Sequence, residues 1–135
     1  MTESELTAIL AAGIEALDVE RRSRAHRFAY VDAMGRDPAT LPERSFTLGF
    51  SALVEEYRQG CVLSCEHILS VYYQAAEGVE ARAAADARVI VRGLPALAGT
   101  HADLWDVRPQ SSGVSETAGQ IVASYSIVSQ YVGEV

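Results

Sequence analysis

One stretch near the C-terminus decides the fold class: Ile121-Val122-Ala123-Ser124-Tyr125-Ser126-Ile127-Val128-Ser129-Gln130-Tyr131-Val132. Successive side chains of a strand point to opposite faces, so the odd-numbered and even-numbered residues of this run form two separate rows. Its β-branched and aromatic residues favour the extended conformation. The run therefore predicts a strand. With a shorter run at Leu104–Val107, ended by Pro109, it predicts an antiparallel hairpin whose small, polar Gln110–Gln120 segment forms a loop or hairpin tip.

A second pair of β-prone runs lies in the middle of the chain. From Arg44 to Ser51, Phe46, Leu48 and Phe50 alternate with smaller residues, and the 61–74 run places Cys65, His67, Leu69, Val71 and Tyr73 on one face. These runs predict a second antiparallel hairpin, with the Val54–Gly60 segment as its connection. Whether residues 52–58 continue the first strand or form a helical turn stays open. A short β-prone run, Phe28–Val31, comes earlier, and the proline-containing residues 32–43 predict a loop.

The sequence also predicts two amphipathic helices, one before the first strands and one between the two hairpins. The first is expected over residues 3–18, because apolar residues recur at helical spacing and Thr2 and Glu5 have the spacing of a capping box. The second carries a stripe of Val79, Ala83, Ala87, Ile90 and Leu94, with Asp86 outside it, and stops at Gly93 and Pro95. Leu97–Thr100 is expected to be a connection.

The order helix, strands, helix, strands predicts one α+β domain over residues 1–135. Its sheet is expected to be mostly antiparallel, with four to five strands and both helices packed on one face. The opposite face of the sheet would carry Ser, Thr, Tyr and Gln, a composition that suits an interface between proteins as well as solvent.

Composition excludes several functions. The formal net charge of −7 argues against a protein whose main task is binding DNA or RNA, because phosphate binding depends on cationic side chains. No apolar run reaches the length of a membrane span, and the acidic Met1–Glu5 start is unlike a secretory signal, so we expect synthesis in the cytoplasm. Nucleotide-binding, metalloprotease, hydrolase and calcium-loop motifs are absent. We therefore expect no catalytic residue, no cofactor and no metal site.

Three weaker signals each have a plain and a functional interpretation. Cys61 and Cys65 are expected to be buried thiols rather than redox or metal groups, since two residues of one strand face suit a disulfide poorly. Cys65 and His67 share a strand face and could form a nucleophile and its base, but we favour two partly buried strand residues. Trp105 marks either the core or a binding surface.

Four arginines within seven residues, Arg21, Arg22, Arg24 and Arg27, form the densest charge in the chain. They fit a solvated helix end, a salt-bridged protein–protein surface, or a weak and salt-sensitive contact with nucleic acid. The sequence leaves all three interpretations open.

The order of elements resembles that of the tail terminator proteins of long-tailed bacteriophages and of the related neck and tail-completion proteins. Four segments carry the resemblance: the helix Glu5–Leu17, the proline-flanked strand start at residues 41–48, the β-run from Ser70 leading into a helix that ends at Leu94, and the alternating strand Ile121–Val132.

This resemblance implies a virion structural protein, assembled in the host cytoplasm, that has no enzymatic activity. Such a subunit forms a ring, expected to be a hexamer, at the head-proximal end of the tail tube. The ring ends tube polymerisation and contacts the tail tube protein and the head-connector proteins, while DNA only passes through its acidic lumen. We expect the subunit interface to include the arginine cluster, Trp105, and three residues of the 110–120 segment: Ser111, Ser112 and Glu116.

Two other functions remain as alternatives. A small ligand-binding or cyclase-like domain would direct Cys65, His67, Tyr73 and Tyr125 into a pocket. A nucleic-acid-associated protein would use the arginine cluster.

Overall fold

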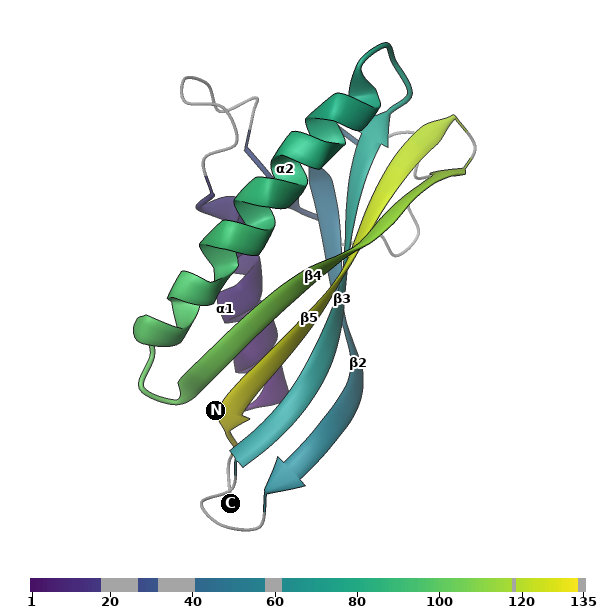
Figure 1. The fold of residues 1–135 in the computed structure, drawn as a ribbon. Coiled ribbons are helices and arrows are strands. Elements are labelled where there is room, and N and C mark those ends of the chain that lie inside the picture. Colours follow the sequence, from purple (N-terminus) through teal and green to yellow (C-terminus); the bar gives the residue numbers. More distant parts are fainter. Residues whose placement is uncertain (18–26, 32–40, 58–61, 118, 134–135) are drawn as a thin grey trace.

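The computed structural model describes residues 1–17, 27–31, 41–57, 62–117 and 119–133, with the side chains of 52–57 and 117 left out. Its elements follow the predicted order (Figure 1). They are α1 (Glu3–Glu15), β1 (Ala29–Tyr30), β2 (Ser45–Tyr57), β3 (Val62–Gln74), α2 (Val79–Gly93), the 3-10 helix η3 (Leu94–Gly99), β4 (Leu104–Thr117) and β5 (Gln120–Val132).

The five strands form one sheet in the order β1-β2-β3-β5-β4. The short β1 runs parallel to β2, and every other neighbouring pair is antiparallel. Both helices lie on the same side of the sheet (Figure 1). This architecture confirms the predicted α+β fold with a mostly antiparallel sheet, and both predicted hairpins are present as β2–β3 and β4–β5.

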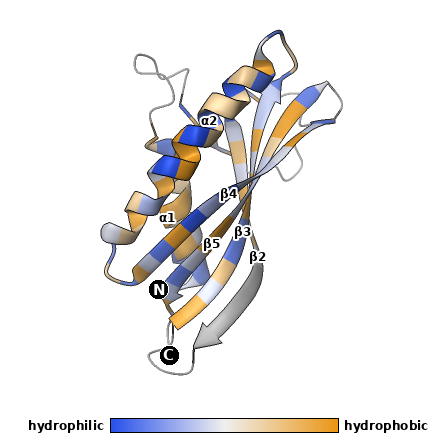
Figure 2. Cartoon of the chain, in the orientation of Figure 1, coloured by the Kyte–Doolittle hydropathy of each residue, from blue (hydrophilic) through white to orange (hydrophobic). Residues whose placement is uncertain are grey.

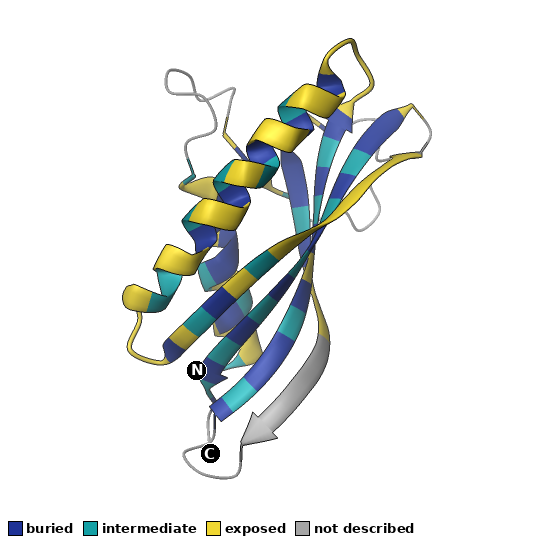
Figure 3. Cartoon of the chain, viewed as in Figure 1, coloured by how far each residue is buried: buried dark blue, intermediate teal, exposed yellow. Residues whose placement is uncertain are grey.

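The core lies between the sheet and the two helices. The predicted alternation holds along β3 and β5: the odd-numbered residues from Cys65 to Tyr73 and from Ile121 to Tyr131 are all buried under the helices (Figure 3). Hydrophobic and hydrophilic bands alternate along the same strands (Figure 2). The opposite, helix-free face is half-buried and bears Ser, Tyr and Gln as expected, together with Ile68 and several valines.

Helix α1 is shorter than predicted. The hydroxyl of Thr2 accepts a hydrogen bond from the backbone N–H of Glu5 at 3.1 Å, so Thr2 caps the helix as expected. Leu6, Leu10 and Ile14 are completely buried. The helix ends at Glu15 rather than at residue 18.

Helix α2 stops at Gly93, as predicted, but the chain continues in a helical form. Leu94–Gly99 is a 3-10 helix with Pro95 in its first turn. The connection predicted at Leu97–Thr100 is therefore wrong for residues 97–99, which are helical. A Cβ on Gly93 would lie 2.5 Å from a methyl group of Leu17. Glycine here lets the end of α2 approach the end of α1 closely.

Three further expectations are corrected. β2 continues through Tyr57, so most of the predicted Val54–Gly60 connection belongs to the strand. β4 continues through Thr117, so most of the predicted 110–120 loop is strand as well. Asp86, expected outside the apolar stripe of α2, is only 1% exposed.

No helix within the described ranges is long and apolar enough to cross a membrane.

Candidate subunit interface

The outer edge strand of the sheet, β4, carries the predicted interface residues of the C-terminal half. Trp105, Ser111, Ser112 and Glu116 all lie on β4, and all four are exposed. Among the described residues, no strand pairs with the outer side of β4. The sequence brought these residues together only as neighbours along the chain, whereas the structure places them along one open sheet edge.

Trp105 is exposed because the strand is irregular at that point. The β4–β5 register shifts between Leu104 and Asp106, so Trp105 falls in a bulge while Leu104 and Val107 on either side are buried. Its side chain is 58% exposed, and an Asp106–Arg108 ion pair lies next to it. An exposed tryptophan beside polar groups is typical of a protein–protein contact.

The end of β4 extends beyond the cover of the helices. Residues 110–116 are exposed throughout (Figure 3). Val114 pairs with Ala123, a core residue, yet it is 52% exposed. We refer to residues 110–117 as the β4 arm. Its uncovered apolar side chain and free backbone edge are features of a surface that pairs with another chain.

The β4 edge also has irregular features that limit its pairing with a strand of another chain. Pro109 lacks an N–H, and a proline in an edge strand turns its nitrogen away from the ladder. A second register shift separates Ser111 from Gly113, whose φ of 115° lies in the region that glycine favours. The longest stretch of the open edge without a register shift or a proline is therefore Gly113–Thr117.

Arg27 lies at the opposite edge of the sheet, two residues before β1. It is exposed, as expected, whereas Arg21, Arg22 and Arg24 lie outside the described residues. Because β1 pairs only with Ser45 and Phe46, no described strand covers β2 beyond that point.

Exposed aromatic side chains gather at this second edge. Tyr30 is 44% exposed and meets Phe46 edge-to-face at 5.6 Å between ring centres. Phe50 is 39% exposed and meets the ring of His67 at 5.7 Å. A hollow of about 460 Å³ lies between Tyr30 and the small residues of α1. Each edge of the sheet therefore presents its own apolar and charged surface.

Cys65 and His67 are strand residues, as we favoured, but they are more deeply buried than expected, and Cys61 lies outside the described residues. Both are completely buried, and the Sγ of Cys65 lies 3.9 Å from the Nδ1 of His67. Burial raises the pKa of Cys65 to about 11 and lowers the pKa of His67. Both shifts favour the neutral thiol and imidazole over the ion pair that a nucleophilic cysteine needs. His67 instead contacts the hydroxyl of Thr7 through Nε2 at 2.8 Å.

The four residues of the pocket alternative all point into the core. Cys65, His67, Tyr73 and Tyr125 are at most 1% exposed. None of them lines the hollow beside Tyr30 or a second cavity of about 400 Å³ at the start of α1. Within the described residues, no group of three or more His, Cys, Asp or Glu side chains is placed to hold a metal ion.

A buried ionic network was missed by the sequence analysis. The Nε of Arg44 donates to the carboxylate of Asp86 at 2.8 Å, and the hydroxyl of Tyr73 donates to the same oxygen at 2.6 Å. Burial and the hydrogen bond to Asp86 raise the pKa of Tyr73. The burial of Asp86 could have been predicted from its position. It follows Val79 by seven residues and precedes Ile90 by four, which places it on the apolar stripe of the helix.

No protein-family model matches the chain, and no curated protein matches it in sequence.

Proposed function

We propose that the protein is a structural subunit that assembles head-to-tail with copies of itself. The single observation that supports this most is the placing of two different exposed surfaces on opposite edges of one sheet: Trp105 and the β4 arm on one side, Arg27 and Tyr30 on the other. A contact between unlike surfaces leaves a free surface at each end, so it produces a closed ring or an open filament.

A closed ring is the form that fits a tail terminator or neck protein of a long-tailed bacteriophage. In this proposal the ring, a hexamer, sits at the head-proximal end of the tail tube in the virion. It ends tube polymerisation and joins the tail to the head-connector proteins. The bulges and Pro109 on the β4 edge support a closed assembly, since they restrict unlimited strand pairing. The protein acts without catalysis or a cofactor, and DNA passes through the lumen.

The test is the native mass of the purified protein, measured by light scattering over a range of concentration and salt, with and without the tail tube protein of the same phage. We expect a discrete ring, or a monomer that becomes a ring when tube protein is added. Reversing the charges of Arg22 and Arg24 together tests the arginine cluster, and we expect weaker assembly. A monomer that is indifferent to concentration, salt and tube protein would overturn the proposal and favour the small ligand-binding domain.

A further inference from the structure

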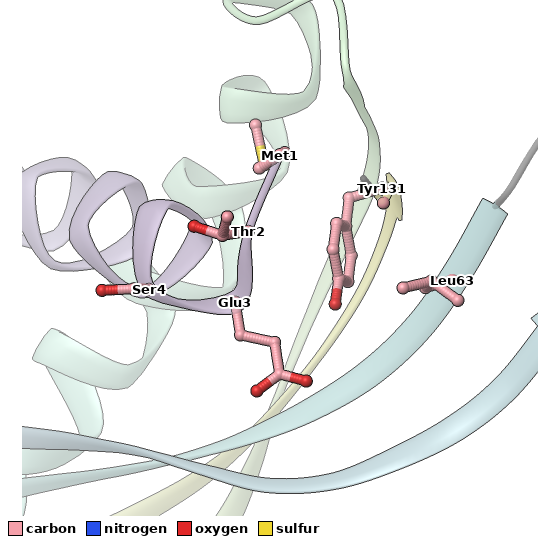
Figure 4. Close-up of a pocket in the computed structure, with 7 residues that line it drawn as sticks. Met1, Thr2, Glu3, Ser4, Leu63 and Tyr131 are labelled. Carbon is pink, nitrogen blue, oxygen red and sulfur yellow. The ribbon is translucent and has the colours of Figure 1, made fainter. Parts of the chain in front are cut away.

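The cavity at the start of α1 contains polar groups that the assembly edges do not use. It has a volume of about 400 Å³ and lies between the beginning of α1 and the inner face of β3 and β5 (Figure 4). Met1 and Glu3 line it from the helix side, and Leu63 and Tyr131 line it from the sheet side.

The Tyr131 hydroxyl is the first unusual feature of this cavity. Tyr131 is only 1% exposed, and its oxygen has no hydrogen-bond partner among the described residues. Buried hydroxyl groups almost always have a partner. Figure 4 shows the hydroxyl directed towards the side of the cavity on which the Glu3 carboxylate lies. Burial raises the pKa of Tyr131 to about 12, so the hydroxyl stays neutral and can both donate and accept.

The second feature is the charge of the cavity. No hydrogen bond or ion pair joins the Glu3 carboxylate to a residue that the structure describes. The ammonium group of Met1 donates to the carbonyl of Val132 at 3.0 Å and lies 4.0 Å from the carboxylate of Asp103. The ammonium group therefore already has two partners, and Asp103 does not line the cavity, so Glu3 is the lining charge that has no ionic partner among the described residues. This balance favours a cationic ligand over an anion.

We propose that this cavity receives the alkylguanidinium side chain of an arginine from a second copy of the chain. The guanidinium would donate to the Glu3 carboxylate and the Tyr131 hydroxyl, and its methylene groups would lie along Leu63. Arginine is the specific choice because all 11 cationic side chains in the sequence are arginine and none is lysine. Copies with a net charge of −7 repel one another, so their association requires matched contacts of this kind. The proposal rests on the self-assembly proposed above.

The site itself is tested without assembly. N-acetyl-L-arginine methylamide is titrated into ¹⁵N-labelled protein, and the amide signals of Leu63 and Gly133 are followed by NMR. We expect saturable binding that Glu3→Gln weakens by about tenfold or more and Tyr131→Phe by about three- to tenfold, the size expected for lost hydrogen bonds.

Two matched controls accompany these variants. Glu5→Gln removes the other carboxylate of the first turn of α1, and Tyr125→Phe removes another buried hydroxyl without a partner from the same face of β5. Neither residue lines the cavity. Both controls should keep the affinity within about twofold, since they remove no contact. Absence of saturable binding, or equal losses in controls and test variants, would overturn the site.

The occupant is tested by the native mass of the same four variants. A second copy is supported if Glu3→Gln and Tyr131→Phe weaken assembly while both controls do not. If the probe binds as expected but Glu3→Gln assembles normally, the second copy is ruled out as the occupant while the proposed function stands. If the unchanged protein binds the probe yet stays monomeric throughout, the proposed function and the occupant both fail, and the alkylguanidinium site stands alone.

Discussion

At the scale of single residues, the Arg44–Asp86–Tyr73 network ties the start of β2 to helix α2. The Arg44 and Asp86 side chains are 3% and 2% exposed, so little water reaches the ion pair. Arg44 also holds a φ of 63°, a backbone region that non-glycine residues seldom adopt. A buried charge without its partner is costly, and this network therefore constrains how residues 41–46 join the sheet.

We expect Asp86→Ala to lower the free energy of unfolding by about 3–5 kcal/mol, because it takes the Asp86 carboxylate away from the buried Arg44 guanidinium and leaves a cavity beside it. Glu43→Ala is the matched control, since Glu43 pairs with Arg82 of the same helix at 2.7 Å but is 37% exposed. It should cost about 1 kcal/mol or less. Urea denaturation followed by circular dichroism measures both, and similar losses would contradict the special role of the buried pair.

The buried His67 makes stability depend on pH. Because burial lowers its pKa below the ordinary 6.5, the unfolded chain binds a proton at this residue more readily than the folded protein does. Its contribution is fully present above pH 6.5 or so and is lost progressively as the pH falls from there towards the folded-state pKa. The groups that face it are Thr7, Cys65 and Phe50.

We expect His67→Gln to flatten the fall in unfolding free energy between about pH 7 and pH 5. His101→Gln, which changes an exposed histidine, should retain that fall. Urea denaturation at several pH values gives the slopes. A His67→Gln slope equal to that of the unchanged protein would show that His67 is not the titrating group.

Cys65 gives a third expectation at this scale. In a Cys61→Ser background, the thiol should react with Ellman's reagent at least about a hundredfold more slowly in native protein than in denaturant, because a pKa of about 11 leaves little thiolate at neutral pH and burial blocks access. Rapid reaction of the native protein would reopen the interpretation of Cys65 and His67 as a nucleophile and its base.

At the scale of elements, the second half of β4 is a strand because it pairs with β5, although its own residues do not favour a strand. Its Ser-Ser-Gly stretch is typical of a turn, yet each regular residue from Gly113 to Thr117 pairs with β5. The strongly β-prone β5 supplies a ladder along its whole length, so the weaker partner becomes strand. Gly113 absorbs the irregularity with its φ of 115°.

Two glycine substitutions test this account of the arm. A Cβ on Gly113 or on Gly49 would meet no atom within 4 Å, so the two positions differ chiefly in backbone conformation. We expect Gly113→Ala to cost about 1–2 kcal/mol of unfolding free energy through strain. Gly49→Ala should be neutral or stabilise by up to about 1 kcal/mol. Thermal and urea unfolding measure both, and equal effects would refute the strain at the bulge.

At the scale of the whole molecule, the two edges of the sheet carry different residues, so each edge can be disrupted by its own substitution. Such variants distinguish head-to-tail assembly from symmetric pairing of two identical edges. A Trp105→Asp/Val114→Asp variant would break only the β4 edge, and a Tyr30→Asp variant only the β1 edge. We expect neither variant to form rings alone. Mixed in equal amounts, they should form one-to-one dimers through the two intact edges, visible by native mass spectrometry. Dimers formed by the Tyr30→Asp variant alone would indicate a symmetric β4–β4 contact instead.

Local patterns were sufficient for the fold class, the order of elements and most of the core. The alternation from Ile121 to Val132 and the helical spacing of Leu6, Leu10 and Ile14 depend only on the chain's own periodicity, so the buried faces of these elements could be predicted without the fold. The burial of Cys65 and His67 agrees with the same alternation, whereas the exposure of Trp105 depends on a bulge that the alternation does not predict.

The order of the strands and the contacts between distant residues became known only from the tertiary structure. That β4 forms an edge while β3 and β5 are central depends on the sheet order, which no local pattern contains. The Arg44–Asp86 pair and the Glu3–Tyr131 cavity each join residues that are far apart in the chain, 42 residues in the first case. Such contacts form only when the helices pack on the sheet, because long-range packing and burial, not local propensity, select them.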